Sequence, residues 1–567
     1  MTRPGSNTAP SLSRGGRLAS QVLSLLPSPS DYRGLRSTWR SDLLAGLTVG
    51  IVALPLALGF GVSSGVSAEA GLVTAIVAGV LAAVLGGSHV QVSGPTGAMV
   101  VVLLPIVATH GVGAVAAVSV MAGVIVLAAG ALRMGRAISF IPWPVIEGFT
   151  LGIAVIIFLQ QVPLLASPHR PRAGEHSSNA IVAAVQSLAA ADLSYLPWSI
   201  GAAAAVVGIM LVAPRIHRAL PGSLIGIVVV TVTVVIAPTP LAVIGALPST
   251  LPAPSLPLLD AAAFVDLLLP ALTVAALAAI ESLLSVRVAA SMVDTGGYDP
   301  DRELVGQGIA SIGSGLFGGM PATGAIARTA VNIRSGGRTR LASAFHAVVL
   351  LVVVLVAAGP VGRIPLAALA GVLMITAVRM VRVRTMRSIL RSTRSDAIGF
   401  VVTAVVTVSV DLIVAVLIGV LCAGFFAVRN LARSTGVRRE QITGDPVPGD
   451  EKIAIVRFDG PLFFAAADRV FDAVTHLAEV EVVILRMSQL ELVDATGAHI
   501  LSDIVQTLER RGVTVLIKGV QPGHEDLFRT VGVLGSLRHH KHLFTGLAEA
   551  VDHARSHVTR NADARSA

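Results

Sequence analysis

Fourteen apolar stretches, separated by short polar segments, fill most of residues 43–430 of this 567-residue chain. Most of them approach the roughly 20 residues that an α-helix needs to cross the hydrocarbon core of a bilayer. Only 13% of all residues are charged, about half the usual share in a soluble domain. An ordinary soluble or disordered protein is thereby excluded, and an all-α polytopic membrane domain is predicted. The predicted spans are 43–65, 69–87, 90–109, 112–131, 138–161, 198–213, 223–244, 263–293, 304–318, 321–333, 341–359, 364–380, 396–411 and 413–430.

The arginines of the connecting loops test this count, because cytoplasmic loops of membrane proteins are enriched in Lys and Arg. With a cytoplasmic N-terminus, the cytoplasmic loops hold fourteen arginines and the opposite loops hold three. The pattern predicts fourteen spans in the plasma (cell inner) membrane, with both termini in the cytoplasm. The fourteen are Arg133, Arg136, Arg215, Arg218, Arg302, Arg334, Arg338, Arg340, Arg379, Arg382, Arg384, Arg387, Arg391 and Arg394, and the three are Arg170, Arg172 and Arg363.

The composition changes on both sides of the membrane domain. Residues 1–42 form a polar N-terminal segment without the short apolar core of a cleaved signal peptide. After the membrane domain (43–433) and a polar linker (434–451), strands alternate with a helix, which predicts a small cytoplasmic α/β domain over 452–555. The last residues, 556–567, are predicted to be a disordered tail. The strands are expected at 452–459, 482–487 and 513–519, and the helix at 494–511.

Two segments repeat the order Pro, then Thr-Gly-Ala, at the start of an apolar stretch. They lie in Val90–Met99 and Gly318–Arg328, and they open the third and tenth predicted spans. The third and tenth spans are seven spans apart. Because seven is odd, two repeats of seven spans each would cross the membrane in opposite directions and so have inverted topology. Short segments interrupted by Gly and Pro at matching places in two halves indicate the binding site of a transporter. Two Pro-kinked helices with small packing residues are the alternative.

Each repeated segment is too short to cross a bilayer as helix alone. Pro95 to His110 would span about 24 Å, against about 30 Å of hydrocarbon, so each is predicted to be a half-helix preceded by extended chain, with Val90–Val92 as a short strand. Two facing half-helix N-termini would attract an anion. A Cβ at Gly97 or Gly324 is expected to intrude on that anion. The predicted substrate-binding residues are Gly94, Pro95, Thr96, Gly97, Ala98, Ala322, Thr323, Gly324, Ala325 and Arg328.

Glu281 lies near the middle of the eighth predicted span. An acid at this depth is costly and indicates a functional site. Ser285 follows one helical turn later on the same face, and both are predicted to take part in ion coupling. Arg328 would add a positive charge beside the anion. The alternative is a structural ion pair between Glu281 and Arg328.

Other features of the sequence argue against catalysis, a cofactor, a metal site and a nucleic-acid partner. The chain contains no P-loop, dinucleotide fingerprint or Ser/His/Asp pattern, so neither an enzyme nor a cofactor is expected. His539-His540-Lys541-His542 resembles a metal cluster but lies in a polar stretch, so a solvated loop is predicted and no metal site. The basic residues are explained by membrane orientation, so no nucleic-acid partner is expected.

Several ordered motifs resemble those of the SulP (sulfate permease) anion transporters, a match that runs from about residue 40 to 555. The soluble part resembles a STAS domain. The motifs are Leu44–Gly50 with Ala53-Leu54-Pro55, Gly94–Gly97, Ala322–Ala330, Asn332–Gly337 and, in the STAS domain, Val493–Gly497.

The resemblance implies a fold of fourteen segments in two inverted seven-segment repeats, divided into a core and a gate like those of uracil permeases and anion exchangers. It implies a secondary anion transporter, commonly a homodimer, with the substrate between the N-termini of spans three and ten and an elevator movement of the core. Substrates in the family include sulfate, bicarbonate, chloride and C4-dicarboxylates.

Two features distinguish sodium-coupled bicarbonate transporters from other members of the family. Sodium-coupled bicarbonate members have Asp and Thr where this chain has Glu281 and Ser285. Arg328 matches an arginine at the anion site of other members. The resemblance therefore favours proton-coupled uptake of sulfate or a related anion. A sodium-dependent bicarbonate or C4-dicarboxylate transporter, and a channel or sensor signalling through the STAS domain to a cytoplasmic partner, remain as alternatives. Thr496 occupies the place of a STAS phosphosite, although a helix-capping role is favoured.

Overall fold

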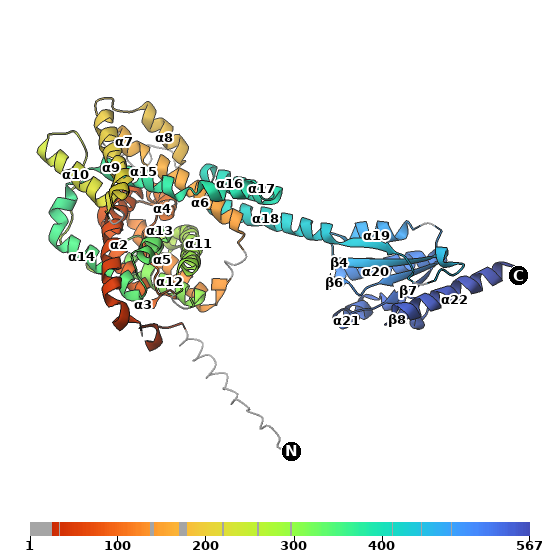
Figure 1. Ribbon diagram of the computed structural model, residues 1–567. Helices are drawn as coiled ribbons and strands as arrows, with labels where there is room; N and C mark the ends of the chain where they lie inside the picture. The colour runs from red at the N-terminus through yellow and green to blue at the C-terminus, as the bar shows by residue number, and fades with distance from the viewer. Residues whose placement is uncertain are drawn as a thin grey trace, which may run out of the picture. The chain divides into compact units, whose positions relative to one another are not determined.

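The computed structural model describes residues 25–32, 34–136, 141–168, 179–217, 220–257, 260–294, 297–410, 412–443, 445–477 and 479–566 (Figure 1). Most of the N-terminal segment and the arginines at 170, 172 and 218 lie outside these ranges. The chain divides into two compact units, Met1–Val420 and Leu421–Ala567.

The first unit is built of helices and one two-stranded ribbon. Its apolar runs form helices because a helix satisfies its own backbone hydrogen bonds where water is absent. The elements are η1 (Pro29–Tyr32), α2 (Leu35–Ser63), α3 (Ala68–Leu85), β1 (Ser93–Gly94), α4 (Gly97–His110), α5 (Gly113–Ala131), α6 (Trp143–Leu159), α7 (Val162–Ala166), α8 (Ala180–Ala189), α9 (Leu196–Ile216), α10 (Gly222–Ile236), α11 (Ala261–Met292), α12 (Pro300–Leu316), β2 (Thr323–Gly324), α13 (Ile326–Arg334), α14 (Arg340–Gly362), α15 (Leu366–Met380), α16 (Val383–Leu390) and α17 (Arg394–Ser409), followed by α18 (Leu412–Ser434), which runs across the boundary between the units.

Every predicted span overlaps one helix, from α2 to α6, from α9 to α15, and at α17 and α18. Within the described ranges, nine helical segments are long and apolar enough to cross a membrane. The helices α4, α10, α12, α13 and α17 have only 9 to 17 residues. The membrane character of the unit is therefore clear, whereas the count of fourteen spans stays a prediction.

Small residues let the helices of this unit approach each other closely. The helix α12 packs against α5 and α3, and α14 packs against α2 and α3. Where α5 meets α12, a Cβ added to Gly308 would lie 2.5 Å from the backbone nitrogen of Leu127, and one added to Gly123 would lie 2.7 Å from the carbonyl oxygen of Gly308. Such backbone contact is typical of helix packing in membranes. Small residues there allow close van der Waals packing, which drives association in place of the hydrophobic effect.

The ribbon of β1 and β2 is the extended chain that the repeated segments predict. The strand occupies Ser93–Gly94 instead of the expected Val90–Val92, because its partner in the antiparallel ribbon is Thr323–Gly324. Both strands are buried, as irregular backbone at membrane depth must be unless it lines a cavity. The helices that follow, α4 with 14 residues and α13 with 9, are short.

The second unit is an α/β domain. Its strands run in the order β3-β4-β5-β7-β8, with β6 paired to β4. β3 pairs antiparallel with β4, and the other pairs are parallel. The elements are β3 (Gly436–Glu440), η3 (Asp450–Lys452), β4 (Ile453–Leu462), α19 (Ala467–Thr475), β5 (Val482–Arg486), β6 (Leu490–Val493), α20 (Ala495–Arg510), β7 (Thr514–Lys518), α21 (Pro522–Val531), η4 (Leu534–Ser536), η5 (His540–His542), β8 (Leu543–Phe544) and α22 (Leu547–Ser566).

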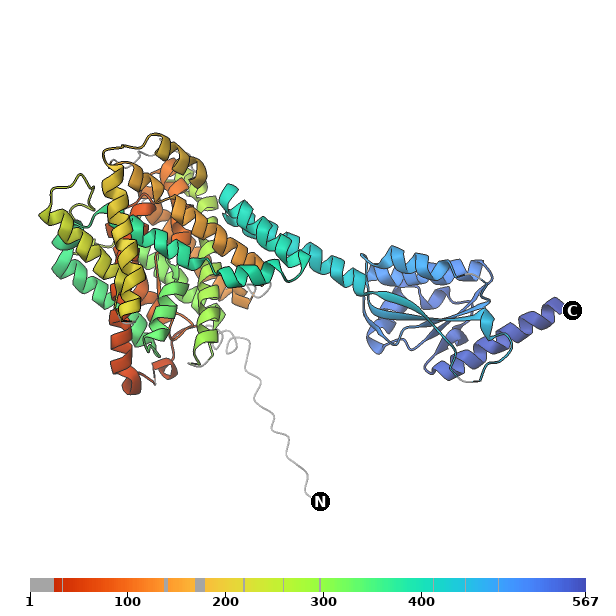
Figure 2. The same ribbon diagram turned by 45° about the horizontal axis from the view of Figure 1, so that its top comes forward.

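Helices cover both faces of this sheet (Figure 2). One core joins the strands to α19, α20 and α21 through residues such as Val456, Leu501 and Phe528. The other joins them to α22 through residues such as Ile455 and Val551. Neighbouring residues of β4 enter opposite cores, as the alternation of side chains along a strand requires. The three predicted strands and the predicted helix are confirmed.

Two predicted boundaries are wrong, and one helix begins earlier than the span that it contains. The stretch 434–451 is more than a linker, because β3 pairs with β4 from Gly436↔Asp459 to Glu440↔Ile455. The stretch 556–566, expected as a disordered tail, is the end of α22. The first long helix begins at Leu35 instead of residue 43. Its early turns are held by Asp42, whose carboxylate accepts from the backbone nitrogens of Arg338 and Thr339 at 2.7 and 3.1 Å.

Candidate anion and ion-coupling site

The antiparallel ribbon brings the two repeated segments together. Ser93 lies opposite Gly324, and Gly94 lies opposite Thr323. The segments are more than two hundred residues apart in the sequence, and each leads directly into a short helix, α4 or α13. The predicted convergence of the two repeats is therefore real, and it is made by backbone hydrogen bonds.

Glu281 of α11 is the point where the two repeats meet. Its Oε2 accepts one hydrogen bond from the hydroxyl of Thr96 and another from the hydroxyl of Thr323, each at 2.7 Å. Thr96 stands at the N-cap of α4, yet its hydroxyl makes no capping bond. Glu281 is partly exposed, whereas both threonines are buried. One carboxylate oxygen thus binds a matching threonine from each repeat.

Two serines of α11 contact the second repeat. Ser282 accepts a hydrogen bond from the backbone nitrogen of Gly324 at 3.0 Å. The predicted Ser285 lies 3.4 Å from the hydroxyl of Thr329, hydroxyl oxygen to hydroxyl oxygen. Sequence reasoning missed Ser282, although its place directly after Glu281 in an apolar helix was an available signal.

Arg328 is 2% exposed and lies on α13. Its Nη2 donates to the carbonyl oxygen of Pro95 at 2.6 Å. Its Nη1 is buried and has no hydrogen-bond partner among the described residues. No ion pair within 4.0 Å joins it to Glu281 in the part of the chain that the structure describes; the carboxylate is bound by the two threonines instead. The structure therefore does not show the alternative, a direct structural pair.

The role expected for Gly97 and Gly324 beside an anion stays a prediction, but each glycine also has a close protein neighbour. A Cβ on Gly97 would lie 2.1 Å from Cδ1 of Ile157, and a Cβ on Gly324 would lie 2.0 Å from Nε2 of Gln91. A Cβ at either glycine would thus displace the end of a neighbouring side chain. Gly94 is the glycine that touches the charged group, because a Cβ there would lie 2.8 Å from Nη1 of Arg328.

Replacing Gly94 by alanine should lower anion affinity. Its φ of +147° is unfavourable for a residue with a side chain, and the added Cβ would displace the guanidinium of Arg328. Binding of labelled anion to the purified variant measures the effect. Gly111→Ala is the matched control, because Gly111 also has a positive φ but no atom within 4 Å of its added Cβ. Equal anion affinity in the two variants would contradict the role given to Gly94.

The remaining predicted residues lie close to the ribbon in the chain. Ala98 and Ala322 are buried, and Ala325 is the N-cap of α13. Ala322 exchanges hydrogen bonds with the hydroxyl of Ser311, at 3.2 Å through its nitrogen and 3.3 Å through its carbonyl. They supply small surfaces and backbone groups.

Glu303, a buried acid that the sequence analysis missed, binds the chain that leads into β1. Glu303 of α12 accepts from the backbone nitrogens of Gly87 and Ser88 at 2.8 and 3.2 Å. It also accepts from the amides of Gln91 and Gln307 at 2.7 and 3.0 Å. The spacing of Glu303 and Gln307, four residues apart on one helix face, was a signal for such a pair. With four donors, Glu303 holds the chain before β1 in place.

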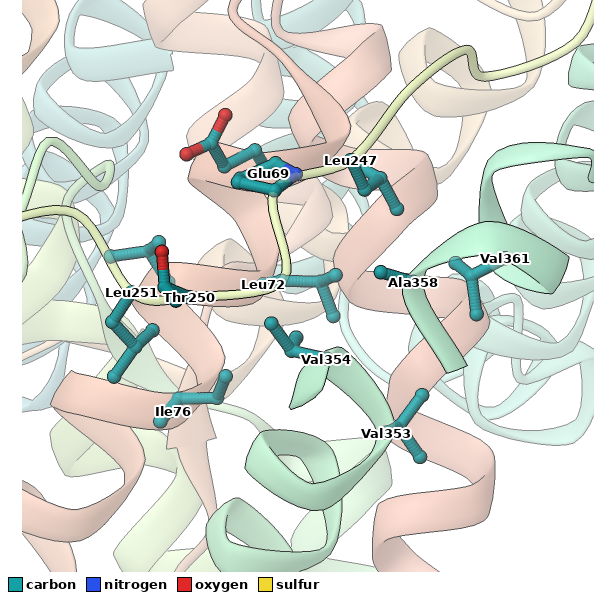
Figure 3. Close-up of a pocket in the computed structure, with 12 residues that line it drawn as sticks. Glu69, Leu72, Ile76, Leu247, Thr250, Leu251, Val353, Val354, Ala358 and Val361 are labelled. Atoms are coloured by element: carbon teal, nitrogen blue, oxygen red, sulfur yellow. The ribbon is translucent and has the colours of Figure 1, made fainter. Parts of the chain in front are cut away.

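A separate pocket lies between α3, α14 and the stretch 247–251 (Figure 3). Leu72, Ile76, Leu251 and Val354 point into it, and Glu69 lies at its rim. None of the predicted site residues lines it. An apolar wall of this kind offers an anion few hydrogen-bond donors, so the pocket does not compete with the site at Glu281.

Two predictions in the α/β unit need correction. Thr496 is not the cap of α20, because the carboxylate of Asp494 accepts from the nitrogen of Gly497 at 2.7 Å. Thr496 itself is exposed in the first turn. The stretch His539–His542 is not wholly solvated, since His542 is only 5% exposed.

Comparisons with known proteins agree with this architecture. A sequence model of the sulfate permease family matches residues 39–404, and a model of the STAS domain matches residues 446–550. The chain is 34% identical over 507 residues to the putative sulfate transporter YvdB of Bacillus subtilis, covering 87% of this chain and 94% of that protein. It is 31% identical over 503 residues to the bicarbonate transporter BicA of Synechocystis, covering 85% and 88%.

A solved structure shows the same fold. The murine anion transporter Slc26a9 in an inward-facing state superposes with a TM-score of 0.80 at 18% identity, covering 97% of this chain and 96% of that one. This chain is therefore a polytopic membrane protein of the sulfate permease family, an anion-transporter family, and carries a STAS domain after its membrane unit.

Proposed function

We propose that this chain moves a small anion, sulfate or a related one, across the plasma membrane by proton-coupled secondary active transport. The observation that carries the proposal is the bonding of Thr96 and Thr323, one from each repeat, to the single carboxylate of Glu281. The unpartnered Nη1 of Arg328 supports it. The site residues thus comprise a titratable acid, two hydroxyls and a cationic donor.

The two threonines link the proton to the anion. While Glu281 is ionised, its Oε2 accepts hydrogen bonds from the hydroxyls of Thr96 and Thr323. Protonation removes the negative charge that would repel an anion, and it frees a hydroxyl to turn its proton toward the anion. Binding of a proton and binding of an anion then favour each other, which is the reciprocal linkage that symport requires.

Arg328 supplies the cationic donor of the proposed site. A buried charged donor without a partner carries a desolvation cost of about 1–3 kcal/mol or more. An anion at Nη1 would remove this cost, while the bond from Nη2 to the carbonyl of Pro95 keeps the guanidinium in place. The starts of α4 and α13 add the partial positive charge of helix N-termini.

The finer architecture belongs to the same proposal. It comprises fourteen spans in two inverted repeats, a core that moves as an elevator against a gate, a homodimer, and cytoplasmic termini. The arginine distribution supports the orientation. The antiparallel pairing of β1 with β2 fits two repeats of opposite direction.

Uptake into proteoliposomes tests the function. Labelled sulfate, bicarbonate, chloride and a C4-dicarboxylate are offered with an inward proton gradient, an inward sodium gradient, or neither. We expect saturable uptake of at least one of these anions that requires the proton gradient. Uptake that requires sodium would contradict proton coupling and favour the sodium-dependent bicarbonate or dicarboxylate alternative. Non-saturating current that needs no gradient of a coupling ion would indicate a channel or sensor.

Removal of the STAS domain should leave the anion site intact. All proposed site residues lie between Gly94 and Arg328, within the first unit. A chain truncated after Ser434, the last residue of α18, should therefore insert into membranes and bind anion with unchanged affinity. Anion binding and thermal unfolding in detergent are measured side by side. A truncated protein that unfolds cooperatively but has lost specific anion binding would contradict this assignment.

The STAS domain is proposed to regulate transport through a cytoplasmic partner. Thr496 is exposed beside the helix start at Asp494, where a phosphate group is favoured by the helix dipole. It is therefore the proposed phosphosite.

A further inference from the structure

Three histidines of the α/β unit gather at one place that the proposed function does not use. His542 ends η5, directly before β8, and His553 and His557 lie one turn apart on α22. Their ligand-capable atoms all lie within 4.8 Å of one another. His542 is 5% exposed, and the other two are partly buried. The cluster joins two segments that the sequence separates by ten residues or more.

The geometry is that of a metal site. The Nε2 atoms of His553 and His557 are 3.3 Å apart, close to the separation of about 3.3 Å that two nitrogens have when each lies 2.0–2.1 Å from a tetrahedral zinc ion. The spacing His553-x3-His557 is one of the usual spacings of zinc-binding histidines. The backbone of Val515 lies close to the ring of His542, but no hydrogen bond of normal geometry reaches its buried Nδ1.

We propose that His542, His553 and His557 bind a transition-metal dication, of which Zn²⁺ is the representative, and that the ion fastens α22 to the sheet. Three imidazole nitrogens suit Zn²⁺, Ni²⁺ or Cu²⁺ and do not suit Mg²⁺ or Ca²⁺, which prefer oxygen. Water or His539 completes the coordination. The ring of His539 lies 6.0 Å from that of His542, and its Nδ1 accepts from the nitrogen of Lys541, so Nε2 is the nitrogen left for a metal.

The metal would act where α22 contacts the strands. The helix is held by an apolar core that contains Ala550, Val551 and Ala554, and β8 pairs with β7 over only two residues. A metal bridge from His542 to α22 would therefore stabilise both the short strand and the last helix. Arg560 and Arg538 lie near His557, and their charge lowers the affinity for any cation.

The rival explanation is that the histidines merely pack. The 3.3 Å between His553 and His557 is also a long hydrogen bond between neutral rings, and the rings of His542 and His557 meet edge to face. Packing alone predicts no metal stoichiometry, so the two explanations differ in a direct measurement.

Metal analysis of the full chain decides between them. The protein is purified in detergent through a tag without histidine, incubated with Zn²⁺ and washed with a weak chelator. We expect about one ion per chain in the wild type, none in His553→Gln/His557→Gln, and one in the control His499→Gln, which changes an exposed histidine of α20. Wild-type protein that retains no ion, or a double variant that retains as much as wild type, would overturn the proposal.

Two further measurements guard against a folding defect. If the double variant does not unfold cooperatively, His557→Gln alone is used. The visible absorption of Co²⁺ bound to the wild type reports a tetrahedral nitrogen site without any variant, and its absence would also overturn the proposal. Zn²⁺ should slow proteolysis of α22 in the wild type and leave the variant unchanged.

Discussion

Glu281→Gln should bind the anion at high pH about as well as the wild type binds it at low pH, and it should lose proton-driven accumulation. The glutamine keeps the length of the side chain and can still accept from Thr96 or Thr323 through its oxygen, but it carries no titratable charge. A single linked proton gives a coupling free energy of about 1–3 kcal/mol, or 5- to 150-fold in affinity. The pH dependence of binding should therefore flatten by a factor in this range.

Binding of labelled anion across pH and uptake under an imposed proton gradient measure the two effects. Glu69→Gln is the matched control, because Glu69 is also a helix acid of the first unit but lies at the rim of the apolar pocket. Thr96→Val is an independent test of the same linkage, since it removes one hydroxyl bound to Glu281 with little change in the shape of the side chain. Proton-driven accumulation by Glu281→Gln at the wild-type level would disprove the assignment of the coupling residue.

Arg328→Ala should weaken anion binding about 10- to 100-fold. The loss corresponds to one charge-assisted hydrogen bond of about 1.5–3 kcal/mol, at 1.4 kcal/mol for each factor of ten in the dissociation constant. Arg328→Lys should recover only part of the affinity. A lysine keeps the charge but cannot donate to the carbonyl of Pro95 and to the anion in the fixed directions of a guanidinium.

The control for this series is Arg287→Gln, which removes an exposed arginine from α11 and should leave the affinity unchanged. Thermal unfolding separates weakened binding from misfolding, because Arg328→Ala also breaks the bond that Nη2 makes to Pro95. A folded Arg328→Ala protein with wild-type affinity would place the anion elsewhere.

Local patterns in the sequence were enough for the class of fold. Apolar runs and the alternation of strands with a helix each depend on residues close in sequence, and each agrees with elements of the structure. The orientation that the arginine asymmetry indicates stays a prediction. The repeated Pro-Thr-Gly-Ala segments and Glu281 were visible for the same reason. A proline or an acid in an apolar helix is anomalous without reference to any distant contact.

Predictions about which groups touch were less successful. An ion pair with Arg328 was the alternative considered for Glu281, whereas the structure gives Glu281 the partners Thr96 and Thr323, 185 and 42 residues away. The contacts that Gly97 and Gly324 make with Ile157 and Gln91 were not predicted either. Glu303 was not predicted, because three of its four donors, Gly87, Ser88 and Gln91, lie more than two hundred residues away in the chain.

The sequence by itself therefore determined that this chain is a polytopic membrane protein followed by an α/β domain, and which segments interrupt its helices. Only the tertiary structure decided the partners of Glu281, the open Nη1 of Arg328, the place of β3 in the sheet and the meeting of His542 with α22. The physical reason is that helix and strand formation follow local periodicity, whereas hydrogen-bond partners and close contacts depend on how segments far apart in the chain pack against each other.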